Sequence, residues 1–246
     1  MSALLALHGF TGSPRSWDFL PEVPNVTRCF IPSLVGHFAS EAGPEVTDFE
    51  LEVDRLTRLS AEANALHVVG YSLGARLALG IALRHPMRVS RLTLISGHPG
   101  LSSDAERAER RTSDERWCEL LLSRGMLAFV DAWQAQPLWT TQARLDPGIL
   151  ERKRSERLSH DATGLIRSLR VTGLAQMPNY RGALAQIRVP VTLIAGGLDA
   201  KFVTLAQQMA KLVPHADLHI VEEAGHDLLL ERPEFVTEVI RRGHQP

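Results

Sequence analysis

The 246-residue sequence predicts an α/β fold, with a mostly parallel sheet of about six strands. Short apolar runs rich in Val, Ile and Leu alternate with segments of helical periodicity. This alternation is typical of a parallel sheet with helices on both faces. The alternation stops between about residues 100 and 180, where the chain is charged and has no strand-like run. We therefore expect an α/β core that is interrupted by a helical insertion.

Individual strands and helices are predicted from the apolar runs and from the Gly, Pro or polar residues that bound them. The predicted strands are residues 3–7, 27–31, 66–69, 89–95, 191–195 and 217–221. The predicted helices are residues 15–20, 46–63, 73–84, 201–213 and 233–242. The predicted core comprises residues 1–100 and 181–246, and the predicted helical cap comprises residues 101–180. Ligands bind at the carboxyl edge of open α/β sheets, so we expect the cap to cover that edge.

Composition excludes several classes of partner. The net charge is −1 and the pI is about 6.8, so no global field favours nucleic acid or an anionic membrane. Two cysteines do not make a disulfide framework. Residues 1–7 are apolar but too short for a membrane span, and they lack the basic start of a signal peptide. We expect a cytoplasmic protein that acts on a small molecule, without a membrane partner; its oligomeric state stays open.

A G-x-S-x-G pattern, Gly70-Tyr71-Ser72-Leu73-Gly74, lies between an apolar run and a helix-like stretch. Strand, sharp turn and helix are the context in which such a pattern forms a nucleophile elbow. The two glycines leave room for a strained turn that exposes the serine at the sheet edge. We interpret Ser72 as a nucleophile or base; the alternative is a plain turn serine.

A serine hydroxyl is weakly reactive at neutral pH unless a histidine takes its proton and a carboxylate orients that histidine. Asp199 follows the predicted strand 191–195, and His226 follows the strand 217–221. Taken singly, Asp199 is equally explained as a helix cap, and His226 as a loop histidine. Together with Ser72, they stand at three strand ends in the order Ser, Asp, His, which predicts a catalytic triad. The adjacent Asp227 is expected to be structural.

An oxyanion hole requires two backbone N–H groups that point at one oxygen. The N–H of Leu73, directly after the nucleophile, is the first candidate, and that of Phe10, in the loop after the first strand, is the second. We interpret His8 in that loop as structural. The other histidines are scattered, without the spacing of metal ligands, so we expect neither a metal nor another cofactor.

This pattern resembles the α/β-hydrolase family over nearly the whole chain. The cap segments Ser96-Gly97-His98-Pro99-Gly100-Leu101 and Phe129-Val130-Asp131-Ala132-Trp133 are similar to those of one subfamily, the 2-succinyl-6-hydroxy-2,4-cyclohexadiene-1-carboxylate synthases of menaquinone biosynthesis. The resemblance implies a carbon–oxygen lyase. Such an enzyme eliminates pyruvate from 2-succinyl-5-enolpyruvyl-6-hydroxy-3-cyclohexene-1-carboxylate by proton abstraction, with no cofactor.

The resemblance also implies a set of substrate-binding residues, namely Tyr71, Arg76, Arg110, Trp133 and Arg154. The implied substrate carries three carboxylates, and arginine is the natural bidentate partner of a carboxylate. Arg76 lies four residues after Ser72, on the first turn of the elbow helix. The alternatives are that the cap arginines form surface ion pairs and that Trp133 is part of the cap core. His98 is a weaker candidate for the substrate-binding set.

Two other functions stay open at this point. A carboxylesterase or thioesterase of the same fold would carry the same triad, and a non-catalytic binding protein of this fold would not need all three groups. The charge of the pocket distinguishes the lyase from the esterase. An esterase pocket is mainly apolar, whereas the lyase is expected to present at least three inward arginines.

Overall fold

The computed structural model describes residues 2–20, 23, 25–38, 40–63 and 65–244, so positions 1, 21–22, 24, 39, 64 and 245–246 of the two predicted core segments lie outside it. A six-stranded sheet in the order β2-β1-β3-β4-β5-β6 forms the centre, and every neighbouring pair of these strands is parallel. The strands are β1 (Ser2–Leu7), β2 (Val26–Phe30), β3 (Leu66–Tyr71), β4 (Val89–Ile95), β5 (Val191–Gly196) and β6 (Ala216–Val221). The predicted sheet is thereby confirmed.

Helices connect the strands. The α-helices are α1 (Phe49–Leu59), α2 (Leu73–Arg84), α3 (Asp104–Gln134), α4 (Pro147–Leu158), α5 (Ala162–Thr172), α6 (Ala200–Ala210), α7 (Leu228–Glu231) and α8 (Pro233–Arg242). Short 3-10 helices are η1 (Pro14–Trp17), η2 (Pro86–Arg88), η3 (Pro137–Arg144) and η4 (Arg181–Gln186). The helix predicted over residues 15–20 is only η1, a single turn with Ser13 in a capping box. Helix α1 begins three residues later than predicted, because Asp48 caps it by accepting from the Leu51 N–H at 2.8 Å.

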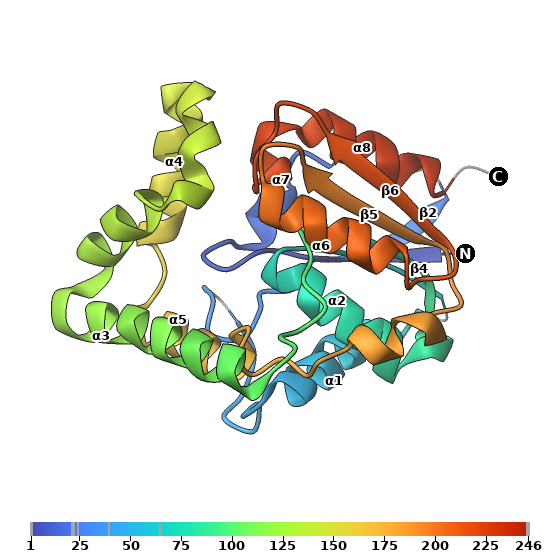
Figure 1. The fold of residues 1–246 in the computed structure, drawn as a ribbon, viewed down its shortest axis with the longest axis horizontal. Coiled ribbons are helices and arrows are strands. Elements are labelled where there is room, and N and C mark those ends of the chain that lie inside the picture. Colours follow the sequence, from blue (N-terminus) through green and yellow to red (C-terminus); the bar gives the residue numbers. More distant parts are fainter. Residues whose placement is uncertain (1, 21–22, 24, 39, 64, 245–246) are drawn as a thin grey trace.

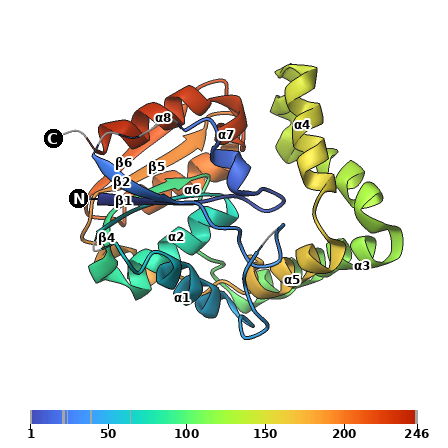
Figure 2. The same ribbon diagram turned by 180° about the vertical axis from the view of Figure 1, so that it is seen from behind.

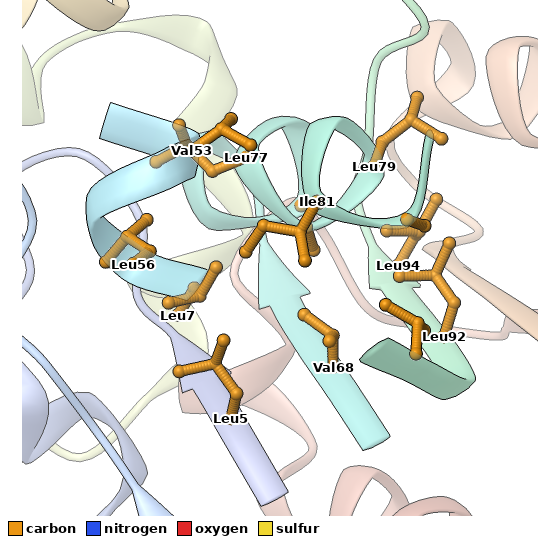
Figure 3. Packing of buried hydrophobic residues seen from close by; sticks show 14 of the residues in the cluster. Leu5, Leu7, Val53, Leu56, Val68, Leu77, Leu79, Ile81, Leu92 and Leu94 are labelled. Carbon is orange, nitrogen blue, oxygen red and sulfur yellow. The ribbon is translucent and has the colours of Figure 1, made fainter. Parts of the chain in front are cut away.

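The core lies on both faces of the sheet. Alternate strand residues such as Leu5 and Val68 pack against α1 and α2, as Figure 3 shows for Leu77 and Ile81 of α2. The other face is covered by η1, α7 and α8, whose apolar residues pack on Leu4 and its neighbours. Because both faces are covered, the central strands are buried and the loops at their carboxyl ends have a rigid base.

Helices α3, α4 and α5 all lie between β4 and β5 in the chain and stand beside the core, on the side to which the arrowhead of β5 points (Figures 1 and 2). Gly125 interrupts α3 with φ 72° and ψ −174°, a conformation that is essentially restricted to glycine. The chain therefore changes direction there, and its last turns run along a new axis. No helix among the described residues is long and apolar enough to cross a membrane.

Candidate active site

Ser72 sits in a strained turn between β3 and α2, with φ 52° and ψ −105°. The turn requires glycine on both sides. A Cβ on Gly70 would lie 2.2 Å from the carbonyl oxygen of Gly74, and a Cβ on Gly74 would lie 2.1 Å from that of Leu7. The β3–α2 turn can therefore pack this tightly only with these glycines, which is the geometry predicted for the elbow.

Three side chains meet in a hydrogen-bonded series at the carboxyl edge of the sheet. The Oγ of Ser72 lies 3.0 Å from Nε2 of His226, and Nδ1 of His226 lies 2.7 Å from Oδ2 of Asp199. The other carboxylate oxygen of Asp199 accepts from the Phe202 N–H at 3.4 Å, at the start of α6. Asp199 thus caps a helix and contacts the histidine at once, so the two alternative roles are compatible. The arrangement suits a serine that transfers its proton to an oriented imidazole.

The imidazole of His226 is held from several sides. Only 2% of the residue is exposed, and its carbonyl oxygen accepts from Ser96 Oγ at 2.9 Å. The Phe202 ring centroid lies 4.4 Å from that of His226, and the rings of Tyr71 and Trp139 lie 5.6 and 5.7 Å away. This packing leaves the ring little freedom to turn away from Ser72. Ser96 follows β4 in the chain and was not singled out from the sequence.

The loop of Phe10 is positioned by buried histidines. His8 accepts from the Leu34 N–H through Nε2 and donates from Nδ1 to the Gly9 carbonyl, at 3.2 and 2.8 Å. His37 accepts from the Thr11 N–H at 3.2 Å. These bonds fix the loop without using the N–H of Phe10, and they agree with the structural role predicted for His8.

A pocket of about 820 Å³ opens beside Ser72, between the sheet edge and the cap helices. Its walls include most of the predicted site residues, namely Phe10, Tyr71, Leu73, Arg76, Arg110 and Trp133. Trp133 also belongs to the cap core, since its ring stacks on Phe129 at 5.7 Å and meets Phe10 edge-on at 5.2 Å. Its indole Nε1 is buried with no protein partner among the described residues.

Two predicted arginines line this pocket. Arg76 is partly buried, and its Nη1 donates to the Thr172 carbonyl at 2.8 Å. Burial, with the positive charge of Arg110 nearby, lowers the pKa of Arg76 to about 9. Arg110 donates from Nε to Asp114 at 2.8 Å, which leaves the rest of its guanidinium group without an ion pair in the described structure. Both side chains therefore retain donors for an anion.

The structure does not bring Arg154 into this pocket. Its Nη1 lies 2.7 Å from Asp131 Oδ1 and 2.9 Å from Gln134 Oε1, both on α3, and the ion pair with Asp131 takes up its charge. Arg154 is therefore not among the residues that line this pocket, and the substrate-binding role predicted for it stays a prediction. The buried arginine of α4 is Arg157, 1% exposed and 5.2 Å from the ring centroid of Trp139, which in turn contacts His226. Burial lowers the pKa of Arg157.

Three further pocket residues were missed or underrated by the sequence reasoning, namely His98, Arg181 and Lys201. Lys201 stands two residues after Asp199 and therefore reaches the same edge, a signal that was available in the sequence. The sequence around Arg181 does not indicate a place in the pocket, because its position depends on how the segment after the cap returns to the core. Within the described residues, no cluster of three His, Cys, Asp or Glu side chains is arranged to hold a metal ion.

The sequence pattern of the alpha/beta hydrolase family matches residues 4–239. The 2-succinyl-6-hydroxy-2,4-cyclohexadiene-1-carboxylate synthase of Salmonella agona is 33% identical over 239 residues, which cover 96% of this chain and 91% of that protein. A Bacillus subtilis protein provisionally given the same name is 35% identical over 247 residues, 97% of this chain and 88% of its own. The chain belongs to the alpha/beta hydrolase family, in its 2-succinyl-6-hydroxy-2,4-cyclohexadiene-1-carboxylate synthase subfamily.

Solved structures agree with this membership. MenH from S. aureus superposes with a TM-score of 0.91 at 30% identity, covering 97% of this chain and 91% of that one. A thermophilic esterase from Thermogutta terrifontis superposes with a TM-score of 0.83 at 23% identity, covering 99% and 89%. The esterase likeness shows the shared fold alone.

Proposed function

We propose that this member of the subfamily eliminates pyruvate from 2-succinyl-5-enolpyruvyl-6-hydroxy-3-cyclohexene-1-carboxylate, giving 2-succinyl-6-hydroxy-2,4-cyclohexadiene-1-carboxylate for menaquinone biosynthesis. The observation that carries the proposal is the set of four cations in the walls of the pocket beside Ser72, namely Arg76, Arg110, Arg181 and Lys201. The walls also hold three carboxylates, of which Asp114 is paired with Arg110, and Glu106 accepts from the N–H groups of Ser102 and Ser103; the third is Glu109. A substrate with three carboxylates must lose water to enter, and paired cations offset that desolvation. An esterase would gain nothing from such walls, since neutral esters favour apolar pockets.

In the proposed reaction, the Ser72–His226 pair acts as a base. His226, oriented by Asp199, accepts the hydroxyl proton, and Ser72 Oγ removes the ring proton next to the succinyl carbonyl. The electron pair moves into the ring, and the carbon–oxygen bond to the enolpyruvyl group breaks. The proton held by the pair neutralises the departing enolate, which becomes pyruvate. No water is consumed, so atoms and charges balance without hydrolysis.

The remaining site residues bind substrate and stabilise charge in this proposal. In this proposal the N–H groups of Phe10 and Leu73 donate to the developing enolate oxygen, where preorganised donors have their largest effect. Leu73 begins α2, so its N–H has no partner within the helix. Tyr71 and Trp133 form walls, and Arg76 and Arg110 bind carboxylates. These steps use side chains and amides of the chain itself.

Placement in the cytoplasm is part of the same proposal. Cys29 and Cys118 are both free thiols, which suits a reducing compartment. Arg154 does not line the pocket in this structure, where it pairs with Asp131, so its role in binding substrate rests on the family resemblance alone.

The test follows pyruvate release from the enolpyruvyl substrate by purified protein, in parallel with hydrolysis of p-nitrophenyl acetate and p-nitrophenyl butyrate. We expect rapid release of pyruvate and formation of the conjugated diene product, with ester hydrolysis slower by orders of magnitude. Fast ester hydrolysis with no pyruvate release would overturn the proposal in favour of a carboxylesterase.

A further inference from the structure

Two chain segments, one on each side of the cap, meet beside the pocket. The N–H of Tyr180 donates to the Pro99 carbonyl at 2.8 Å. Gly100 has φ 99°, and a Cβ there would lie 2.4 Å from the Pro178 carbonyl oxygen, so the two backbones approach as closely as only glycine allows. His98 and Arg181 each lie one residue from this hydrogen-bonded pair, and both line the pocket. They are therefore held on adjoining segments of the same wall.

His98 is arranged as a neutral hydrogen-bond donor. Its Nδ1 accepts from the Gly100 N–H at 3.0 Å, so the ring proton must lie on Nε2. That Nε2–H has no protein acceptor within the described part of the chain. Burial, with the positive charges of Arg76, Lys201 and Arg181, lowers the pKa of His98 to about 3. The residue therefore offers the pocket a neutral N–H at physiological pH.

Arg181 is a cation with unused donors. Its Nη1 donates to Gln208 Oε1 at 3.1 Å at an exposed edge, while its Nε is buried with no partner in the described structure. No described carboxylate lies within ion-pairing distance of it. A buried N–H without an acceptor is costly unless a ligand supplies one. The unused donors of Arg181 and His98 thus face one pocket from adjoining segments.

We propose that Arg181 and His98 form a second carboxylate subsite, which binds the succinyl carboxylate of the substrate and so determines specificity. This inference rests on the proposed function. The succinyl carboxylate ends a flexible chain of two methylene groups and takes no part in bond making or breaking. Arg76, one helical turn from Ser72, lies on the elbow helix and is better placed for the groups near the reacting carbon.

This pairing matches the chemistry of the ligand. A guanidinium fork supplies two donors to a carboxylate, and a neutral N–H supplies a third without adding charge to a pocket whose walls hold four cations and three carboxylates. The succinyl carboxylate does not react, so the subsite binds it equally well in the bound substrate and in the transition state. Loss of the subsite should therefore raise KM more than it lowers kcat.

The first experiment measures steady-state pyruvate release by Arg181→Gln, Arg181→Lys and two control variants. We expect Arg181→Gln to raise KM about 10- to 100-fold with kcat changed less than about threefold, and Arg181→Lys to recover part of the loss. Gln208→Ala removes the one hydrogen-bond partner of the Arg181 guanidinium group among the described residues, and Arg188→Gln removes an exposed arginine of the same segment. Both controls should stay within about twofold of the unaltered protein. An unchanged KM in Arg181→Gln, or the same loss in Arg188→Gln, overturns the subsite.

The second experiment identifies which carboxylate is bound. The substrate is compared with its methyl ester at the succinyl carboxylate, in the unaltered protein and in Arg181→Gln. We expect esterification to raise KM in the unaltered protein and to have little further effect in Arg181→Gln, because the contact is already lost. An ester penalty of equal size in both proteins would show that Arg181 contacts another carboxylate, and the assignment would be wrong.

The third experiment separates this inference from the proposed function. Isothermal titration of succinate into the unaltered protein and into Arg181→Gln measures the subsite without turnover. We expect saturable binding that weakens at least tenfold in the variant. If succinate binds in this manner but no pyruvate is released, the subsite stands and the proposed reaction fails. If pyruvate is released but succinate binding does not depend on Arg181, the reaction stands and the subsite fails.

Discussion

The Oγ of Ser72 lies 3.0 Å from Nε2 of His226, although 154 residues separate the two along the chain. The contact exists because β3 and β6 both end at the same edge of a parallel sheet, and because the β3–α2 turn holds Ser72 in a conformation that few residues adopt. The same pair supports ester hydrolysis and proton abstraction equally well. The walls of the pocket, and not the triad, therefore carry the distinction between the two chemistries.

Replacement of Ser72 by alanine should lower kcat for pyruvate release by several orders of magnitude, because the serine and histidine act as a unit. The unfolding free energy should change by less than about 1 kcal/mol, since a hydroxyl is removed from a partly exposed position. Steady-state kinetics and urea unfolding measure the two effects. Near-normal turnover by a well-folded variant would exclude Ser72 from the chemistry.

Arg76→Ala should lower kcat/KM by roughly 30- to 1000-fold, equivalent to about 2–4 kcal/mol, through loss of a charge-assisted contact in a partly desolvated pocket. Because Arg76 is on the first turn after Ser72, kcat should fall as well as KM rise. Arg116→Ala is the matched control, since Arg116 is exposed on the outside of α3. Equal effects of the two substitutions on kcat/KM would contradict a specific role for Arg76.

The sheet, the elbow and the triad could be predicted because their signals are local. Apolar runs mark strands, and each triad residue lies in the turn or loop that follows one. The cap residues could not be placed in this way. The break in α3 depends on the backbone angles of Gly125, and the choice between Arg154 and Arg157 depends on which face of α4 packs inward. Arg181 reaches the pocket only through the close contact of residues 178–180 with Pro99 and Gly100, which is a tertiary feature.

Arg157→Ala should reduce both stability and activity, whereas Arg154→Ala should do neither to a large extent. Arg157 is fully buried against Trp139, so its removal leaves a cavity behind a ring that contacts His226. The Arg154–Asp131 pair is partly exposed, and such pairs contribute about 0–1 kcal/mol. Thermal unfolding and pyruvate release should be measured for both variants.

Arg157→Met separates packing from charge at this position. The methionine side chain fills most of the volume of the arginine, so Arg157→Met should be more stable than Arg157→Ala. Its activity should stay low if the buried charge is required. A greater loss of activity in Arg154→Ala than in Arg157→Ala would return the substrate-binding role to Arg154.

Acid should weaken the fold through His8, which positions the loop of Phe10. Burial lowers the pKa of His8 from 6.5 to about 4, so the folded protein keeps this ring neutral while the unfolded chain protonates it below about pH 6.5. The stabilisation is therefore complete above pH 6.5 and is lost as the pH falls toward 4. Between pH 7.5 and pH 5 the loss from this group is about 2 kcal/mol.

The comparison of the unaltered protein with His8→Gln isolates that contribution. The variant should be less stable at pH 7.5, because it loses the paired hydrogen bonds to Leu34 and Gly9. Its deficit in unfolding free energy should shrink by about 2 kcal/mol at pH 5, since glutamine does not titrate. Urea unfolding at several pH values provides the measurement, with His215→Gln, at an exposed position, as the matched control. A deficit that stays constant with pH would mean that His8 is accessible to protons in the folded protein, and that its loop is not held by a neutral imidazole.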